Sequence, residues 1–192
     1  MAHRFSELTF TPAVESIQQH FGSFEKMQQM RGRMPDFDRL RERECAFISQ
    51  RDSFYMATVS ENDWPYIQHR GGPLGFLQII NDRCLAFANY RGNSQYQTLG
   101  NSTHNNKVAL FLVDYANKRR LKILGRMRIY FLDDLSERLK PVMDYCSEKE
   151  RVESIIEIEL EAFDWNCSQY LTPRFSEEQL LELGVIKQGD LT

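Results

Sequence analysis

Residues 68–76, with the sequence QHRGGPLGF, have the composition best suited to holding an anionic ligand. Arg70 supplies a permanent positive charge that pairs well with a phosphate. Gly71, Gly72 and Gly75 carry no Cβ, so the main chain there can approach a ligand closely and turn its N–H groups toward it. We therefore expect this stretch to be the centre of a binding site, although Gly71 and Gly72 are also consistent with a simple β-bulge.

Residues 89–96, with the sequence NYRGNSQY, form a second candidate for contact with an anion. The pattern predicts the end of a strand, then a polar loop, then a short helix. Asn93 or Ser94 would cap that helix, and the free N–H groups of its first turn would then face an anion. This arrangement favours a phosphate group.

Residues 119–131 alternate between two faces, which predicts one long strand. One face carries four cations: Arg120, Lys122, Arg126 and Arg128. Two interpretations are open: the cations bind an anionic ligand, or they pair with the glutamates on one face of a predicted neighbouring strand, residues 156–162. Those glutamates are Glu157, Glu159 and Glu161. In the second case part of the basic face is structural.

The sequence lacks the side-chain combinations that carry hydrolytic or metal chemistry. It has no Gly-x-Ser-x-Gly motif, and its histidines have no acidic or thiol neighbour at metal-ligand spacing. The cysteines stand far apart, at Cys45, Cys84, Cys146 and Cys167. Neither a zinc site nor a disulfide framework is indicated. We therefore expect no metal, and a bound organic cofactor that carries the chemistry.

The charge balance and the hydropathy limit the partners of the chain. Its 192 residues carry a net charge of −3, which argues against a protein that neutralises nucleic-acid phosphates. No apolar run approaches the roughly 20 residues needed to cross a bilayer, and the N-terminus lacks the apolar stretch of a signal peptide. We expect a cytoplasmic protein with a small-molecule substrate and with neither a nucleic-acid nor a membrane partner.

The periodicity predicts three regions: a helical lead-in over residues 1–45, a β domain over 46–174, and a C-terminal helix and tail over 175–192. Short apolar runs broken by turns predict strands at residues 54–59, 65–70, 76–80, 84–88, 108–113, 119–131 and 156–162. Helices are predicted at residues 14–21, 36–46, 135–152 and 176–183, with a loop at 99–106. About six or seven strands of this length suit a small barrel, because closure removes exposed edges.

Three blocks in order carry a resemblance to a known family: residues 65–73 (PYIQHRGGP), 85–93 (LAFANYRGN) and 119–126 (RRLKILGR). The sequence resembles the pyridoxamine 5′-phosphate oxidase-like family of FMN-binding split barrels over about residues 46–131. Residues 165–174 are similar to the family's C-terminal cofactor-contacting segment. The resemblance implies a mainly β (α+β) split barrel of six or seven antiparallel strands with flanking helices. It also implies a homodimer with FMN at the interface.

Carried over by position, the resemblance and the loop pattern give a set of cofactor-binding candidates. They are Gln68, His69, Arg70, Gly71, Gly72, Asn89, Arg91, Asn93, Ser94, Gln95, Arg120, Trp165 and Arg174. In this set the strand beginning at Gln68 lies along the flavin and its phosphate, and Ser94 and Gln95 belong to the phosphate loop. Trp165 and Arg174 match a pair contributed across the dimer interface.

The chain departs from the oxidase itself at several of these positions. The oxidase has arginine at the position of Gln68, lysine at that of Pro73, and an arginine-lysine pair in place of Ser94 and Gln95. Arg70 and Arg91 are nearby cations that can compensate for these losses. The oxidase's C-terminal Arg-x-His substrate motif is missing, which argues against pyridoxamine phosphate as the substrate.

The resemblance implies an FMN-dependent oxidoreductase that acts on an unidentified small substrate. No residue is an obvious general base, and His69 is the best candidate because it adjoins the site and titrates near neutrality. Two alternatives stay open: a protein that stores or senses flavin without turnover, and a haem-binding relative with His69 or His104 as axial ligand. The substrate, the electron donor, and the choice among FMN, FAD and a deazaflavin are not determined by the sequence.

Overall fold

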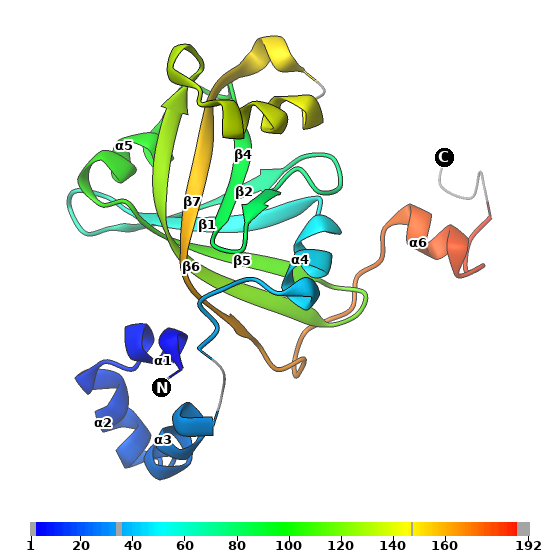
Figure 1. Ribbon diagram of the computed structural model, residues 1–192. Coiled ribbons are helices and arrows are strands. Elements are labelled where there is room, and N and C mark those ends of the chain that lie inside the picture. The colour runs from blue at the N-terminus through cyan, green and yellow to red at the C-terminus, as the bar shows by residue number, and fades with distance from the viewer. Residues whose placement is uncertain (1–2, 34–35, 147, 188–192) are drawn as a thin grey trace.

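The computed structural model describes residues 3–33, 36–146 and 148–187. They form a seven-stranded antiparallel sheet in the order β2-β1-β5-β6-β7-β4-β3, which coils into a barrel that is not closed (Figure 1). The strands are β1 (Ser53–Val59), β2 (Pro65–Gly71), β3 (Gln78–Asn81), β4 (Cys84–Tyr90), β5 (Lys107–Asp114), β6 (Arg119–Phe131) and β7 (Val152–Trp165). The predicted mainly β split barrel with six or seven strands and flanking helices is confirmed.

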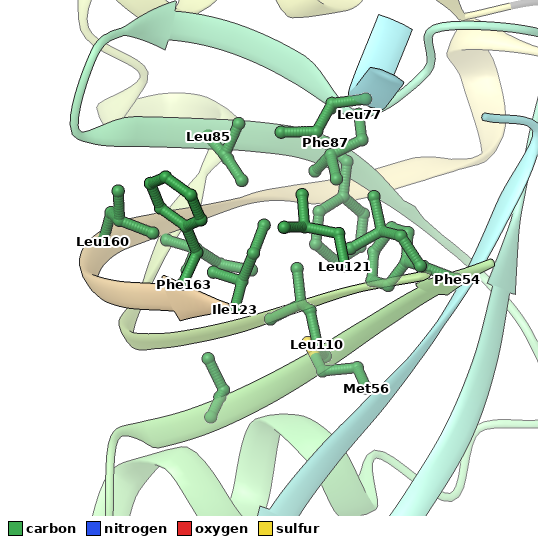
Figure 2. Close-up of a cluster of buried hydrophobic side chains, with 14 of the residues drawn as sticks. Phe54, Met56, Leu77, Leu85, Phe87, Leu110, Leu121, Ile123, Leu160 and Phe163 are labelled. Atoms are coloured by element: carbon green, nitrogen blue, oxygen red, sulfur yellow. The ribbon is translucent and has the colours of Figure 1, made fainter. Parts of the chain in front are cut away.

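The core fills the inside of this coiled sheet. Every second residue is buried in β5 and in the middle of β6, residues 121–127, so each strand turns one apolar face inward there. Figure 2 shows side chains from five strands and from the segment before β3 pointing toward one another. Those labelled are Phe54, Met56, Leu77, Leu85, Phe87, Leu110, Leu121, Ile123, Leu160 and Phe163. Burying each such side chain stabilises the fold by about 1.5–3 kcal/mol relative to exposure.

A bulge between β6 and β7 depends on a glycine. The pairing register shifts between Leu124 and Gly125. A Cβ on Gly125 would lie 2.6 Å from Cγ2 of Ile158 and 2.7 Å from the carbonyl oxygen of Glu159. Only glycine therefore allows the two long strands to approach this closely, and the bulge bends the sheet at this point.

Helices cover the two ends of the barrel (Figure 1). Three of them, α1 (Arg4–Thr9), α2 (Pro12–His20) and α3 (Phe24–Arg33), gather at the end where β7 finishes. At the opposite end lie the 3₁₀ segments η1 (Leu132–Asp134), η2 (Glu137–Tyr145) and η3 (Lys149–Arg151). The remaining helices are α4 (Glu42–Ser49) before β1, α5 (Gln97–His104) before β5, and α6 (Glu177–Glu182) near the C-terminus. Helices end as predicted at Gly22 and Gly184, both with positive φ.

The predicted helix over residues 36–46 is wrong in its first half. Helix α4 begins only at Glu42, and Phe37 has a φ of +51°. The carbonyl oxygen of Phe37 accepts from the N–H of Phe163 (2.8 Å), and the N–H of Leu40 donates to Asp82 O (2.7 Å). Because the barrel takes these backbone groups, they are not free to form helical hydrogen bonds.

The predicted helix over residues 135–152 is also wrong, because the described part of this stretch forms short 3₁₀ turns. Pro141 lies inside η2 and cannot donate a backbone hydrogen bond. Leu139 and Val142 are nevertheless buried, so the stretch still covers its end of the barrel. Residue 147 lies outside the described residues.

Two smaller boundaries differ from prediction. The strand expected at residues 76–80 begins at Gln78, because Phe76 and Leu77 turn into the core. Most of the loop expected at residues 99–106 is helical, because α5 extends to His104.

Candidate functional site

A polar cavity of about 270 Å³ lies where β2, the end of β4 and helix α5 meet. From β2 it is lined by Tyr66, Gln68 and Arg70, which share one face because alternate strand residues point the same way. From β4 it is lined by Asn89 and Tyr90. The loop residues 92–96 and the first turn of α5 complete the wall.

Arg70 is the dominant feature of this cavity, named here the Arg70 pocket. Its guanidinium donates one hydrogen bond, from Nη1 to Oδ1 of Asn89 (3.2 Å), and its carbon lies 5.9 Å from the ring centroid of Phe87. Its Nε is buried without a partner among the described residues. Burial lowers the pKa of Arg70, yet an arginine of this kind stays protonated. The result is a partly buried positive charge with a free donor.

No aspartate or glutamate is among the described residues that line the Arg70 pocket. A buried cation is normally balanced by a carboxylate or by a bound anion. Since the chain supplies no such carboxylate in the lining, the pocket is suited to an anionic group that accepts several hydrogen bonds.

Two neutral contacts hold the walls in place. The side chain of Asn89 is buried, and its Nδ2 donates to Oγ of Ser154 (3.3 Å), which aims its oxygen at Arg70. The buried Thr98 donates from Oγ1 to Oε1 of Gln68 (3.0 Å), which ties α5 to β2. These contacts fix the donors before any ligand binds.

The start of α5 adds backbone donors to the wall. The N–H of Gly100 makes the first bond of the helix, to the carbonyl oxygen of Tyr96 (2.8 Å). The N–H groups of Gln97, Thr98 and Leu99 therefore lie at the open N-terminus of the helix, which favours negative charge. Ser94 and Tyr96 have positive φ values of 60° and 50°, an uncommon conformation for residues other than glycine.

The prediction that Asn93 or Ser94 caps this helix is wrong. The N-cap residue is Tyr96, which makes no side-chain capping hydrogen bond. Asn93 instead accepts from the N–H of Gln95 at its own Oδ1 (3.3 Å). Because the side-chain oxygen of Asn93 is used by this loop, it does not accept from the N–H groups of the helix that follows.

The structure brings six of the predicted cofactor contacts together in the Arg70 pocket. They are Gln68, Arg70, Asn89, Asn93, Ser94 and Gln95. His69 does not line it, because it follows Gln68 on the strand and points to the other face, where its ring contacts Tyr55 (centroids 5.5 Å apart). Arg91 also lies outside the lining and donates from Nε to Glu153 (3.1 Å).

The glycines of residues 68–76 serve packing. The N–H of Gly72 donates to the carbonyl oxygen of Asp52 (2.9 Å), and that of Gly75 to Arg51 O (3.0 Å). A Cβ on Gly72 would lie 2.7 Å from Cγ of Phe76. The prediction that these glycines turn their N–H groups toward a ligand is therefore wrong for Gly72 and Gly75. Gly71 ends β2, opposite Ser53, and does not line the pocket.

The remaining three candidates lie outside the pocket lining. Arg120 donates from Nη2 to the carbonyl oxygen of Cys167 (2.9 Å), which anchors the segment after β7. Trp165 donates from Nε1 to Glu44 (2.7 Å), and the guanidinium carbon of Arg43 lies 4.3 Å from its ring. Arg174 lies over the ring of Tyr115 at 5.0 Å. Within one chain Arg120 and Arg174 lie on the outside of the barrel, and Trp165 packs against the core, on the ring of Phe47 (centroids 4.9 Å apart).

The basic face of β6 is paired with carboxylates of β7. Lys122 contacts Asp164 (3.1 Å), and Arg128 contacts Glu159 (3.2 Å). Arg126 contacts Glu161 (2.6 Å). The interpretation of this face as one half of a strand pair is therefore confirmed, and these three cations have carboxylate partners.

Tyr66 and Thr98 are among the residues that line the pocket and that the sequence analysis did not propose as contacts. Tyr66 lies on the same face of β2 as Gln68 and Arg70, so strand alternation would have identified it. Thr98 lies in the first turn of a helix whose start was predicted too early. Among the described residues, no group of three histidines, cysteines or acidic residues could hold a metal ion. None of the described helices is both long and apolar enough for a membrane span.

The fold is similar to that of several solved structures of low sequence identity. HupZ of Group A Streptococcus is 14% identical with a TM-score of 0.54, over 71% of this chain and 100% of that one. A putative pyridoxamine 5′-phosphate oxidase of Lactobacillus delbrueckii is 15% identical with a TM-score of 0.52, over 66% and 94%. An FMN-binding protein of Syntrophomonas wolfei is 14% identical with a TM-score of 0.50, over 81% and 97%.

Sequence comparison gives the family. No curated protein matches the chain. The family described as pyridoxamine 5′-phosphate oxidase matches residues 40–165, which include every strand of the sheet and all of the Arg70 pocket. The structural similarities agree with this assignment. The chain therefore belongs to the pyridoxamine 5′-phosphate oxidase family.

Proposed function

We propose that the Arg70 pocket binds the phosphate of FMN and that the protein is a flavoprotein. The observation that carries this proposal is the guanidinium of Arg70, which is partly buried, has a free Nε and faces a lining without carboxylates. A phosphate offers the charge and the acceptors that such a site lacks. Membership of the family and the similarity to an FMN-binding protein support the same ligand.

The residues present fit one end of this cofactor. Arg70 would hold the phosphate together with the N–H groups at the start of α5, while Gln68 and Thr98 supply polar contacts beside it. The volume of about 270 Å³ is just below the range of small-molecule sites, roughly 300–1,000 Å³. The pocket therefore suits the phosphate end of FMN, and we propose that a second copy of the chain completes the site.

An apolar outer face supports a homodimer. On the side of β1 and β2 away from the core, Ile67 lies opposite Ala57, and Tyr55 lies opposite His69. Ile67 is 64% exposed and the nearby Trp64 is 73% exposed. A contiguous apolar sheet face of this kind suits a second copy. We expect Ile67→Lys to shift the protein from dimer to monomer in analytical ultracentrifugation, and an unchanged mass would contradict the assigned face.

When bound, FMN supplies hydride and electron transfer. On this basis we propose an oxidoreductase that acts on a small organic substrate in the cytoplasm. The chain's own contribution is to orient the cofactor through Arg70 and Gln68, which Asn89 and Thr98 hold in position. The described lining of the Arg70 pocket has no histidine, cysteine or carboxylate, so any general base comes from outside it, with His69 as the candidate on the dimer face.

The same lack of a base in the lining favours a second candidate function, the binding or storage of flavin without turnover. The two functions differ in how the bound flavin reacts. Reduction by NADH or NADPH followed by reoxidation at a useful rate supports the oxidoreductase, and a flavin that does neither supports storage.

The experiment that tests flavin binding is the absorption spectrum of the purified protein, followed by chromatography of the compound released on heating. The expected result is the spectrum of an oxidised flavin and released FMN. A haem spectrum, or a colourless protein that takes up no added FMN, would contradict the proposal.

A further inference from the structure

The loop after β4 runs from Arg91 to Tyr96, and its residues 92–96 line the Arg70 pocket. Tyr96 is also the N-cap of helix α5, so the position of the loop sets the position of the helix N–H groups beside it. Ser94 and Tyr96 have positive φ values. Residues other than glycine keep this conformation only where the surrounding structure holds it. The loop therefore needs a partner outside itself.

Glu153 on β7 is such a partner. Its Oε1 accepts two hydrogen bonds from the loop, one from Nε of Arg91 (3.1 Å) and one from the hydroxyl of Tyr96 (3.1 Å). A single carboxylate oxygen thus joins the first and the last residue of the loop. The side chain of Glu153 is 22% exposed, and it is not among the described residues that line the pocket. Glu153 therefore acts on the loop and not on the contents of the pocket.

A β-bulge directs Glu153 toward this loop. In the pairing of β4 with β7, Asn89 lies opposite Ser154. The next residue of β4, Tyr90, lies opposite Val152, so Glu153 is the extra residue of β7 at this point. A bulge breaks the regular alternation of a strand and re-aims a side chain. Here it places Glu153 where its carboxylate reaches the loop after β4.

The neighbouring residue on β7 holds the other side of the pocket. Oγ of Ser154 accepts from Nδ2 of Asn89 (3.3 Å), and Oδ1 of Asn89 accepts from Nη1 of Arg70 (3.2 Å). Two successive residues of β7 therefore fix two walls: Ser154 fixes the guanidinium through Asn89, and Glu153 fixes the loop and the start of α5. An anion that accepts from both walls binds well only if both are held in place.

We propose that Glu153 is a positioning residue for phosphate binding in the Arg70 pocket. It holds Arg91 and Tyr96 so that the N–H groups at the start of α5 and the guanidinium of Arg70 face the same anion. Because Arg91 pairs with Glu153, the carboxylate adds little repulsion to the site. Arg91 then serves the pocket through Glu153 and not as a direct phosphate contact. This inference rests on the proposed function, in which the pocket holds the phosphate of FMN.

The test compares the affinities of FMN and riboflavin, which lacks the phosphate, by equilibrium titration of flavin fluorescence. Glu153→Ala should lower the preference for FMN about fivefold and leave the affinity for riboflavin nearly unchanged. Glu153→Gln should keep most of the preference, because the amide oxygen still accepts from Arg91 and Tyr96. A purely structural role would weaken the binding of both flavins alike. Tyr96→Phe removes one of the two hydrogen bonds and should have an intermediate effect on the preference.

Glu159→Ala is the matched control. It removes a carboxylate of the same strand whose partner, Arg128, lies outside the pocket lining, and it should leave the preference unchanged. Amide hydrogen exchange of residues 92–99 in the flavin-free protein gives a second readout of the loop. Exchange there should become faster in Glu153→Ala and stay close to wild type in Glu153→Gln.

The outcomes separate this inference from the proposed function. A wild type that binds FMN no more tightly than riboflavin contradicts the proposed function and the role of Glu153 with it. If the wild type prefers FMN and Glu153→Ala keeps the full preference, the inference alone is overturned. Unchanged hydrogen exchange of residues 92–99 in Glu153→Ala would also overturn it, because the loop would then be held without the carboxylate.

Discussion

The cations of β6 and the single arginine Arg70 of β2 lie on the same sheet but have different surroundings. On β6, Lys122, Arg126 and Arg128 each contact a carboxylate of β7, at 2.6–3.2 Å. Arg70 on β2 is also held by a side chain, but its partner is the neutral oxygen of Asn89. The positive charge of these three residues of β6 is therefore cancelled, and that of Arg70 is retained in its pocket.

This difference shows that the number of cations on a strand does not locate an anion site. Exposed ion pairs are each worth about 0–1 kcal/mol and remain solvated. A partly buried cation without a carboxylate is costly to the free protein, and this cost is relieved when an anion binds. In this chain Arg70, a partly buried arginine in a pocket without carboxylates, is more informative than the more basic face of β6.

Arg70→Ala is the change with the largest expected effect. Loss of a charge-assisted hydrogen bond should weaken FMN binding by roughly 1.5–3 kcal/mol, measured by equilibrium titration of flavin fluorescence. The free energy of unfolding of the flavin-free protein should change little, because a poorly compensated charge is removed together with its contacts. Unchanged FMN affinity would remove Arg70 from the site.

Asn89→Asp turns Arg70 into a paired cation like those of β6. A carboxylate at the position of Oδ1 competes with the ligand phosphate for the guanidinium and repels it. We expect FMN affinity to fall about tenfold, which corresponds to about 1.4 kcal/mol, in the same titration. Asn89→Ser, which removes the contact without adding charge, is the matched control and should have a smaller effect. Equal effects of the two variants would contradict the role given to charge.

Arg126→Ala tests the paired group through stability. The hydrogen bond from Arg126, opposed by burial and assisted by Arg4, holds the pKa of Glu161 below its ordinary value. A carboxyl with a lowered folded pKa stabilises the fold above its unfolded pKa, and this contribution is lost as pH falls through the folded value. The variant should lose about 0.2–1 kcal/mol in urea unfolding at pH 7, with the difference closing in acid. FMN affinity should not change.

Arg128→Ala should have the smallest effect. Arg128 and its partner Glu159 are both more than half exposed. Solvent therefore screens the pair, and the free energy of unfolding should stay within about 0.5 kcal/mol of wild type in urea. A large loss of FMN affinity in this variant would mean that the basic face of β6 contributes to the site after all.

The strands were predictable because each one carries its own period. Residues 119–131 alternate throughout, and β6 has these same bounds. The helix expected over 135–152 failed because charged composition does not distinguish an α-helix from 3₁₀ turns, and Pro141 already removes one backbone donor. The helix prediction failed over residues 36–41 because their backbone partners, Phe163 and Asp82, are brought close only by the fold.

The members of the site were predictable where the residue type alone suggests contact with an anionic ligand. Arg70 and Asn89 were identified from their blocks, and the structure places both in one pocket. The packing role of Gly72 was not predictable, because Asp52, whose carbonyl oxygen accepts from its N–H, lies twenty positions away in the sequence. Whether the cations of β6 were free depended on the register of β6 against β7, which alternation within one strand does not specify.

The most direct test of the account compares FMN with riboflavin, which lacks the phosphate, in equilibrium titrations of wild-type protein and Arg70→Ala. If the Arg70 pocket holds the phosphate, wild type should bind FMN at least about tenfold more tightly than riboflavin, and the variant should lose most of that preference. Equal affinity of the wild type for the two flavins would contradict the account, because the unpaired arginine would then have no part in flavin recognition.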